Sequence, residues 1–323
     1  MENLCTYQFR DKTTCKEPAQ GNTGYCFWHD PNADRAGVDI KKTLDEKHKK
    51  GEKLEGFNLQ KANLEGINFT YSDLYNANFK RANLRGAHFF GSNLNKTNLF
   101  KANLENSNLK QTTMYDAELL GARLGNASLD NVEFGTENKI KNEIEGDIYL
   151  SRGEDDKAVE KYYEAMEIYL NIKNNFKNRG LQNQAGKYFY REMVMQRKLT
   201  PFYSFERFWS FLLDISSGYG EKPFKIIGFS AIIVIGFMFI FSVTGLNDSA
   251  GNISLLSANQ TSQEVLQIFF NSLYYSMATF TTLGISEFMP FGIGKFFAVV
   301  EAYTGFFLIV LFVITIYKRY MER

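Results

Sequence analysis

Cysteine and histidine are scarce in this chain, whose 323 residues contain three of each. No histidine stands in a supported serine–histidine–aspartate pattern and no phosphate-binding loop is present, so we expect no enzyme. No basic segment precedes an apolar run at the N-terminus, which predicts no secretory signal and a cytoplasmic front part. The net charge is only +1, which gives no reason to expect a nucleic-acid partner.

Lysine and arginine are missing altogether from residues 226–294, in the C-terminal part of the chain. Residues 226–247 and residues 295–317 are each apolar and long enough to cross a membrane, which requires about 20 residues. Their length and flanks favour membrane spans over the alternative of buried helices in a soluble protein. Basic residues lie outside the interval on both sides. Because positive charge stays on the cytoplasmic side, we predict two spans in the cell (inner) membrane with both termini cytoplasmic.

A third apolar segment lies between these spans, over residues 264–280, with apolar side chains at helical spacing. It is too short to span, which predicts a re-entrant pore helix that is buried in protein or lines water. The sequence LYYSMATFTTLGISE, from Leu273 to Glu287, resembles the pore helix and filter of two-transmembrane potassium channels (the ion channel 2 family), whose motif is T-x-x-T-T-V-G-Y-G-D. The resemblance implies a homotetramer that conducts K⁺ or another monovalent cation. The filter that it implies consists of Thr281, Thr282, Leu283, Gly284, Ile285, Ser286 and Glu287.

The outer end of this filter departs from the family motif. Ile285, Ser286 and Glu287 replace the Tyr, the second Gly and the Asp of that motif. Serine does not reach the unusual backbone angles that glycine reaches freely, and Ile285 has no hydroxyl to hold the filter's diameter. We therefore predict a wider or softer outer filter with an acidic ring at Glu287. Weak potassium selectivity and strong selectivity both stay open.

Two residues of the second span are candidates for pore support or gating. Glu301 is the only charge in residues 226–247 and 296–317, and an intramembrane carboxylate is costly unless it has a partner. We expect Glu301 behind the filter, bonded to pore-helix hydroxyls or backbone, in preference to acting as an ion ligand. Gly305 lies where family members have a hinge glycine, and close helix packing is the alternative.

Leucine or phenylalanine recurs every five residues over residues 54–135, a period that fits neither a helix nor a strand. Mostly small residues stand two positions before each of them. The pattern resembles the pentapeptide-repeat family, A-[DN]-L-x-x, which implies a right-handed quadrilateral β-helix that needs capped ends. The residues expected on its axis are Leu54, Leu59, Leu64, Phe69, Leu74, Phe79, Leu84, Phe89, Leu94, Leu99, Leu104, Leu109, Met114, Leu119, Leu124, Leu129 and Phe134.

The repeat predicts a rod more clearly than it predicts a role for the rod. Acidic and basic residues are equal in number over residues 52–133, which argues against mimicry of DNA. A spacer, an oligomerisation element or a docking site for a cytoplasmic protein or ligand is the better expectation. The rival to a channel is therefore a non-conducting, membrane-anchored scaffold or sensor that uses the rod for protein interaction.

Residues 1–31 predict a small metal-binding module, because Cys5, Cys15, Cys26 and His29 form a C-x9-C-x10-C-x2-H pattern. An odd number of cysteines in a cytosolic segment disfavours disulfides. A module of this size has too little core to fold without a staple. Three thiolates and one imidazole make a closed, tetrahedral, structural Zn²⁺ site, with free thiols as the alternative.

The remaining segments connect these parts. Residues 32–53 predict a charged linker or helix, and residues 139–198 predict helices with Tyr162 and Tyr163 on one apolar face. The stretch GEDDKAVEKYYEAMEIY resembles a tetratricopeptide helix pair. Residues 201–218 are aromatic and amphipathic, which predicts an interfacial helix on membrane lipid. The expected fold is a multidomain membrane protein with a cytoplasmic β-helix, an α-helical connector and a two-helix, pore-loop, tetrameric channel domain.

Overall fold

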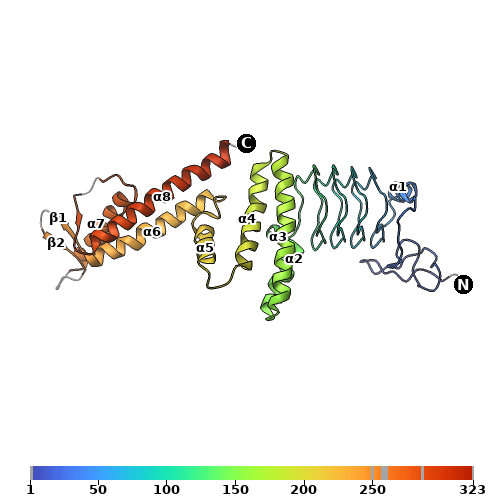
Figure 1. The fold of residues 1–323 in the computed structure, drawn as a ribbon, viewed down its shortest axis with the longest axis horizontal. Coiled ribbons are helices and arrows are strands. Elements are labelled where there is room, and N and C mark those ends of the chain that lie inside the picture. The colour runs from blue at the N-terminus through green and yellow to red at the C-terminus, as the bar shows by residue number, and fades with distance from the viewer. Residues whose placement is uncertain (1–2, 249–250, 256–260, 285–286, 322–323) are drawn as a thin grey trace. The chain divides into compact units, whose positions relative to one another are not determined.

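The computed structural model describes residues 3–248, 251–255, 261–284 and 287–321. The chain divides into two compact units, one ending at Phe202 and one beginning at Tyr203, and each is described by itself. The helices of the first unit lie at the two ends of a β-helix (Figure 1). They are α1 (Lys41–Lys49), the 3₁₀ helix η1 (Thr136–Asn138), α2 (Lys141–Ser151), α3 (Asp155–Asn178) and α4 (Gln182–Leu199).

The repeat forms a β-helix in which parallel bridges join residues 20 positions apart, such as Asn58 to Asn78. Four five-residue faces therefore make one coil, as the resemblance to the pentapeptide-repeat family implied. Every apolar position expected on the axis is buried, and so are the small residues two positions before them. Each coil donates backbone hydrogen bonds to the next, for example from the Leu59 N–H to the Asn78 carbonyl at 2.8 Å. Stacked amides add a second ladder, in which Asn78 Nδ2 donates to Asn58 Oδ1 at 2.9 Å.

The N-terminal module and α1 cover the first coil of the β-helix. Trp28 stacks on Phe57 with ring centroids 5.1 Å apart, and the Asn58 N–H donates to the Trp28 carbonyl at 2.7 Å. Leu44 of α1 is fully buried. These contacts give hydrogen-bond partners to backbone groups of the first coil and bury its apolar surface, both of which an open sheet edge would leave exposed.

Helix α3 covers the other end of the β-helix. Two polar side chains of α3 and that of Arg179, which directly follows the helix, are spaced four residues apart and donate to carbonyls of the last coil. The pairs are Asn171 with Ala122, Asn175 with Leu124, and Arg179 with Ala127. Both ends of the rod are therefore capped by other parts of the same chain.

Helices α2, α3 and α4 match the predicted connector, with α2 and α3 joined at Gly153. The ring of Tyr162 packs against Gly146, where an added Cβ would lie 2.6 Å from it. The prediction that Tyr163 shares this buried face was wrong, because its side chain is 55% exposed. Consecutive residues of a helix with 3.6 residues per turn point in directions about 100° apart.

The second unit contains four helices and a small antiparallel sheet with the order β2-β1-β3. The first apolar helix ends at Thr244 instead of continuing to residue 247, because Gly245 (φ +88°) leaves the helical region and β1 follows. The sheet was not predicted, because its strands are only two or three residues long. The elements are α5 (Phe205–Ser217), α6 (Pro223–Thr244), β1 (Leu246–Asp248), β2 (Gly251–Ile253), α7 (Ser262–Phe280), β3 (Met289–Pro290) and α8 (Gly294–Met321).

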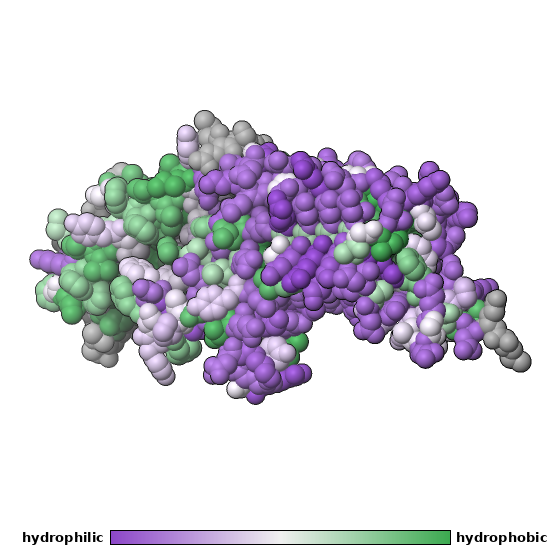
Figure 2. Space-filling model, turned by 45° about the vertical axis from the view of Figure 1, so that its right-hand side comes forward, coloured by the Kyte–Doolittle hydropathy of each residue, from purple (hydrophilic) through white to green (hydrophobic). Residues whose placement is uncertain are grey.

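Two helices are long and apolar enough to span a membrane, namely α6 and residues Gly294–Lys318 of α8. Only 17% of each span is buried within the chain, whereas the core helix of a soluble protein would be mostly buried. Figure 2 shows the resulting apolar surface on the second unit and the hydrophilic surface of the first. The exposed apolar surface is consistent with membrane association.

Helix α5 lies within residues 201–218, for which the sequence predicts an interfacial helix. Its side chains Phe205, Phe208 and Trp209 are more than half exposed. Its opposite face is polar and buried, and there Asp214 Oδ1 accepts from Lys225 Nζ of α6 at 3.1 Å. An aromatic exposed face opposite a buried polar face suits a helix that lies in the headgroup layer.

Candidate metal centre and candidate pore

The four predicted metal ligands come together because backbone bridges and a turn position them. Bridges between Leu4 and Pro18 and between Gln8 and Thr14 place the segment that contains Cys5 beside the one that contains Cys15. A turn, in which the His29 N–H donates to the Cys26 carbonyl at 3.2 Å, brings the other two ligands to the same side.

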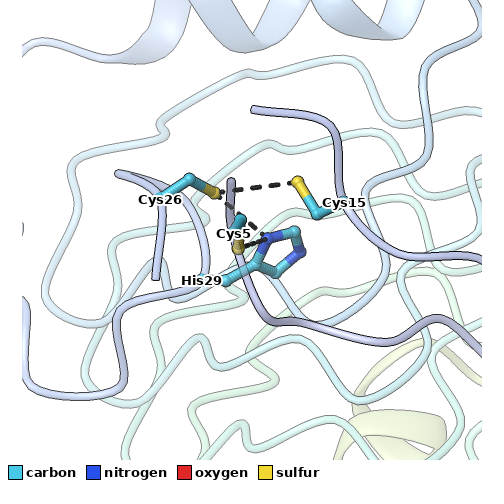
Figure 3. A group of neighbouring side chains, drawn as sticks. All are labelled: Cys5, Cys15, Cys26 and His29. Carbon is cyan, nitrogen blue, oxygen red and sulfur yellow. Dashed lines mark hydrogen bonds between the residues drawn. The ribbon is translucent and has the colours of Figure 1, made fainter. Parts of the chain in front are cut away.

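The four side chains of this cluster lie close together (Figure 3). Their four ligand atoms lie within 4.8 Å of one another, and all four residues are buried. Cys15 Sγ is 3.9 Å from Cys26 Sγ, and His29 Nδ1 is 3.2 Å from Cys26 Sγ and 3.7 Å from Cys5 Sγ. Zn–S bonds of about 2.3 Å and Zn–N bonds of about 2.0 Å put tetrahedral ligand atoms about 3.5–3.8 Å apart. The cluster can therefore bind a metal ion such as zinc.

The protonation of the cluster also agrees with this role. His29 Nε2 lies 3.0 Å from the Glu55 carbonyl oxygen, which can only accept, so Nε2 must have the proton. Nδ1 is then the free nitrogen, and it is the one that faces the sulfurs. Burial lowers the pKa of His29 and keeps the ring neutral, as a ligand must be. Burial raises the pKa of the Cys15 thiol to about 12, so thiolates at this position need a cation to compensate their charge.

Two residues that support the cluster were missed at the sequence level. Glu55 accepts from the Arg10 N–H at 2.9 Å, and its carbonyl orients His29 from the first coil of the rod. The ring of Tyr7 stacks on the His29 ring at 4.0 Å. Nothing in the sequence signals either contact, because the Glu55 contact depends on how the module docks on the β-helix and the Tyr7 contact depends on how the module itself folds.

In the second unit, α7 packs against both candidate spans. A capping box between Thr261 and Glu264 fixes the beginning of α7. Its buried residues Tyr275 and Phe280 pack against α6, α8 and β1, in clusters that contain Phe241 and Leu308. The predicted filter directly follows the end of α7.

The first residues of the predicted filter follow α7 in a turn. Thr281 ends the helix with its hydroxyl on the Met277 carbonyl at 2.7 Å, and Thr282 and Gly284 have φ angles of +55° and +63°. Thr281, Thr282, Leu283, Gly284 and Glu287 are exposed in the single chain. The predicted filter residues Ile285 and Ser286 lie outside the described residues.

Glu301 of α8 faces α7, the helix that the sequence predicts to be a pore helix. Its side chain is fully buried, and its carboxyl Oε1 is hydrogen-bonded to Ser276 Oγ of α7. Gly305, one turn further along α8, faces the end of α7. A Cβ at Gly305 would lie 2.0 Å from the Phe280 carbonyl oxygen. The geometry favours close helix packing over the alternative of a hinge.

Replacing Gly305 by alanine is expected to destabilise the second unit, because the added methyl overlaps backbone that cannot rotate away. Overpacking of this kind typically costs about 1–3 kcal/mol. Thermal unfolding of the full chain in detergent would measure it. Gly236→Ala is the matched control, since Gly236 is a helical glycine of α6 with nothing within 4 Å of an added Cβ. Equal melting temperatures for the two variants would contradict the packing interpretation.

Comparison with known proteins identifies the repeat. Pentapeptide repeats match in eight copies, over residues 53–86 and 92–131. No curated protein matches the chain. Among solved structures, the chain is similar to a pentapeptide repeat protein from the thylakoid lumen of Arabidopsis thaliana, with 23% identity, 32% of this chain and 69% of that chain covered, and a TM-score of 0.25.

Two cyanobacterial pentapeptide repeat proteins are also similar. One, from Cyanothece 51142, has 31% identity over 27% of this chain and 61% of that chain, with a TM-score of 0.21. The other, from Nostoc, has 27% identity over 31% of this chain and 78% of that chain, with a TM-score of 0.24. The family match is confined to the β-helix of the first unit. Residues 53–86 and 92–131 are therefore a pentapeptide-repeat region, as the five-residue period predicted.

Proposed function

We propose that four copies of the chain form a cation channel in the cell membrane, with the first unit and both termini in the cytoplasm. The observation that supports this proposal is the order of α6, α7, the Thr281–Gly284 segment and α8, with α7 packed against both spans. A short helix followed by irregular backbone is tolerated at membrane depth only inside protein or beside water. Four copies around an axis provide both surroundings.

The proposed chemistry is the replacement of a cation's water shell by filter oxygens. Thr282, Leu283 and Gly284 would supply the inner carbonyls, and exposed Glu287 would add an acidic ring at the outer mouth. Ile285 and Ser286 interrupt the potassium-channel motif. We therefore propose a monovalent cation pore whose potassium selectivity is weaker than that of the family.

Current across planar bilayers tests this function, with the purified full chain between potassium on one side and sodium on the other. Clear current with a reversal potential near zero supports a weakly selective pore. A reversal near the potassium equilibrium value would show that conduction is right and that the account of the substituted filter is wrong. Silence over a range of voltages, with the protein shown to be inserted, would favour the scaffold.

The metal centre is proposed to hold a structural zinc ion. Three sulfurs and one imidazole nitrogen leave no open position for a reacting water, and this ligand set suits zinc. Its role would be to fix the N-terminal module on the first coil of the rod, because His29 is bonded to Glu55 of that coil.

A non-conducting membrane scaffold is the second candidate. The capping of both rod ends favours it, because the lateral faces of the rod then remain for a cytoplasmic protein or ligand. The turn at Thr281 and Thr282 also differs from the extended strand of a potassium filter. Conductance separates the two functions, since only the channel requires it.

A further inference from the structure

A hydrogen-bonded chain of three groups joins α6, α7 and α8 inside the second unit. Ser276 Oγ of α7 lies 2.9 Å from the carbonyl oxygen of Val234 in α6. The same Oγ is hydrogen-bonded to Oε1 of Glu301 in α8. Ser276 and Glu301 are both fully buried, and Glu301 Oε2 has no hydrogen-bond partner among the residues that the structure describes.

Counting protons in this chain decides the state of Glu301. A serine hydroxyl has one proton, and the Val234 carbonyl has none to donate. If Glu301 were ionised, the Ser276 hydroxyl would stand between two acceptors and could satisfy only one, leaving a close contact of oxygens with no hydrogen. A neutral carboxylic acid removes this conflict. Glu301 O–H then donates to Ser276 Oγ, and Ser276 O–H donates to the Val234 carbonyl.

The surroundings of Glu301 also disfavour an ion. Among the described residues, no lysine, arginine or histidine forms an ion pair with it. A buried carboxylate with one oxygen unpartnered and no counter-charge is costly, whereas a buried neutral acid is not. The titratable group that faces it from α7 is the phenol of Tyr275. The only charged residue of α6 is Lys225, which is bonded to Asp214 near the start of that helix, and on α8 the side chains of Lys295 and Tyr303 are exposed.

We infer that Glu301 is a protonated, hydrogen-bond-donating positioning residue, which fastens the pore helix to both spans through Ser276. Its neighbours on the same face of α8 support this role. Gly305 closely contacts the Phe280 backbone, and Leu308 packs in one cluster with Phe280. Residues 301, 305 and 308 thus form one stripe that holds the last turn of α7, directly before Thr281. That α7 is a pore helix rests on the proposed function, whereas the protonated acid and its bond to α7 do not.

The inference predicts how two substitutions differ. Glu301→Gln retains a donor, because the glutamine amide can donate to Ser276 Oγ at any pH. Glu301→Leu has similar volume and no donor, which leaves Ser276 with one partner fewer. We expect the glutamine variant to melt close to the wild type at neutral pH and the leucine variant to melt lower. Raising the pH enough to ionise Glu301 should loosen α7 in the wild type and leave the glutamine variant unchanged.

Infrared spectroscopy of the full chain in lipid at neutral pH tests the protonation directly. An exposed glutamate, with a pKa of about 4.3, is ionised there. We expect the carbonyl stretch of a protonated carboxylic acid in the wild type and its loss in Glu301→Gln. Glu264→Gln, at the exposed start of α7, is the matched control and should leave that band unchanged.

Ser276→Ala keeps the inference testable if Glu301→Gln does not fold. Removing the acceptor should move the acid band to the position of a more weakly bonded acid. A wild type without any such band, or a band that both variants leave unmoved, would overturn the inference. A band that behaves as expected in a protein that conducts no ions would reject the proposed channel alone.

Discussion

Serine in place of Cys26 is expected to abolish zinc binding by the N-terminal module and to unfold it. The Cys26 sulfur lies 3.2 Å from His29 Nδ1 and 3.9 Å from Cys15 Sγ, so the proposed tetrahedral site loses one of its four ligands without it. A structural zinc ion contributes on the order of 10 kcal/mol or more to a small module. Within the described part of residues 1–31, the secondary structure is limited to isolated bridges and turns, which cannot replace that energy.

Zinc content of the purified full chain, measured by plasma mass spectrometry, gives the first check. We expect zinc in the wild type and in His88→Gln, which changes an exposed histidine outside the cluster, and none in Cys26→Ser. Amide hydrogen exchange gives the second check. Protection should fall over the module and around Asn58, whose N–H donates to Trp28, and should persist near Leu124, which α3 covers. Unchanged zinc content in Cys26→Ser would remove the metal proposal.

The β-helix could be predicted from the sequence because the five-residue period of the sequence is also the repeat of the structure. Each five-residue unit places one large apolar side chain on the axis, so Leu54 to Phe134 could be assigned without knowing the contacts between coils. The cluster of Cys5, Cys15, Cys26 and His29 could be predicted for a similar reason. Its residue types have few uses together, and the structure brings all four within bonding reach of one ion.

The unpredicted features depend on contacts between distant segments. Glu55 orients His29 only because the module docks on the first coil, and the spacing of 26 residues between them is not periodic. Asn171 and Asn175 cap the rod through side chains that would be ordinary on any exposed helix face. Neither role has a local signal. The proposed filter has the same difficulty, because its carbonyls acquire a common axis only when four chains converge.

Alanine in place of Gly284 is expected to abolish the proposed current. Gly284 has a φ angle of +63°, a left-handed conformation that costs other residues roughly 1–2 kcal/mol. Because ion flow depends on carbonyls held at a fixed spacing, we expect loss of conduction in chains that still fold.

A second glycine supplies the matched control for this experiment. Gly292 has a φ angle of +50° and lies outside the filter, with nothing within 4 Å of an added Cβ. Gly292→Ala therefore introduces similar backbone strain and should retain current in planar bilayers at equal protein loading. If Gly284→Ala conducts as Gly292→Ala does, the filter assignment is wrong. If the assignment holds, the double change of Ile285→Tyr and Ser286→Gly restores the potassium-channel motif and should move the reversal potential toward the potassium equilibrium value.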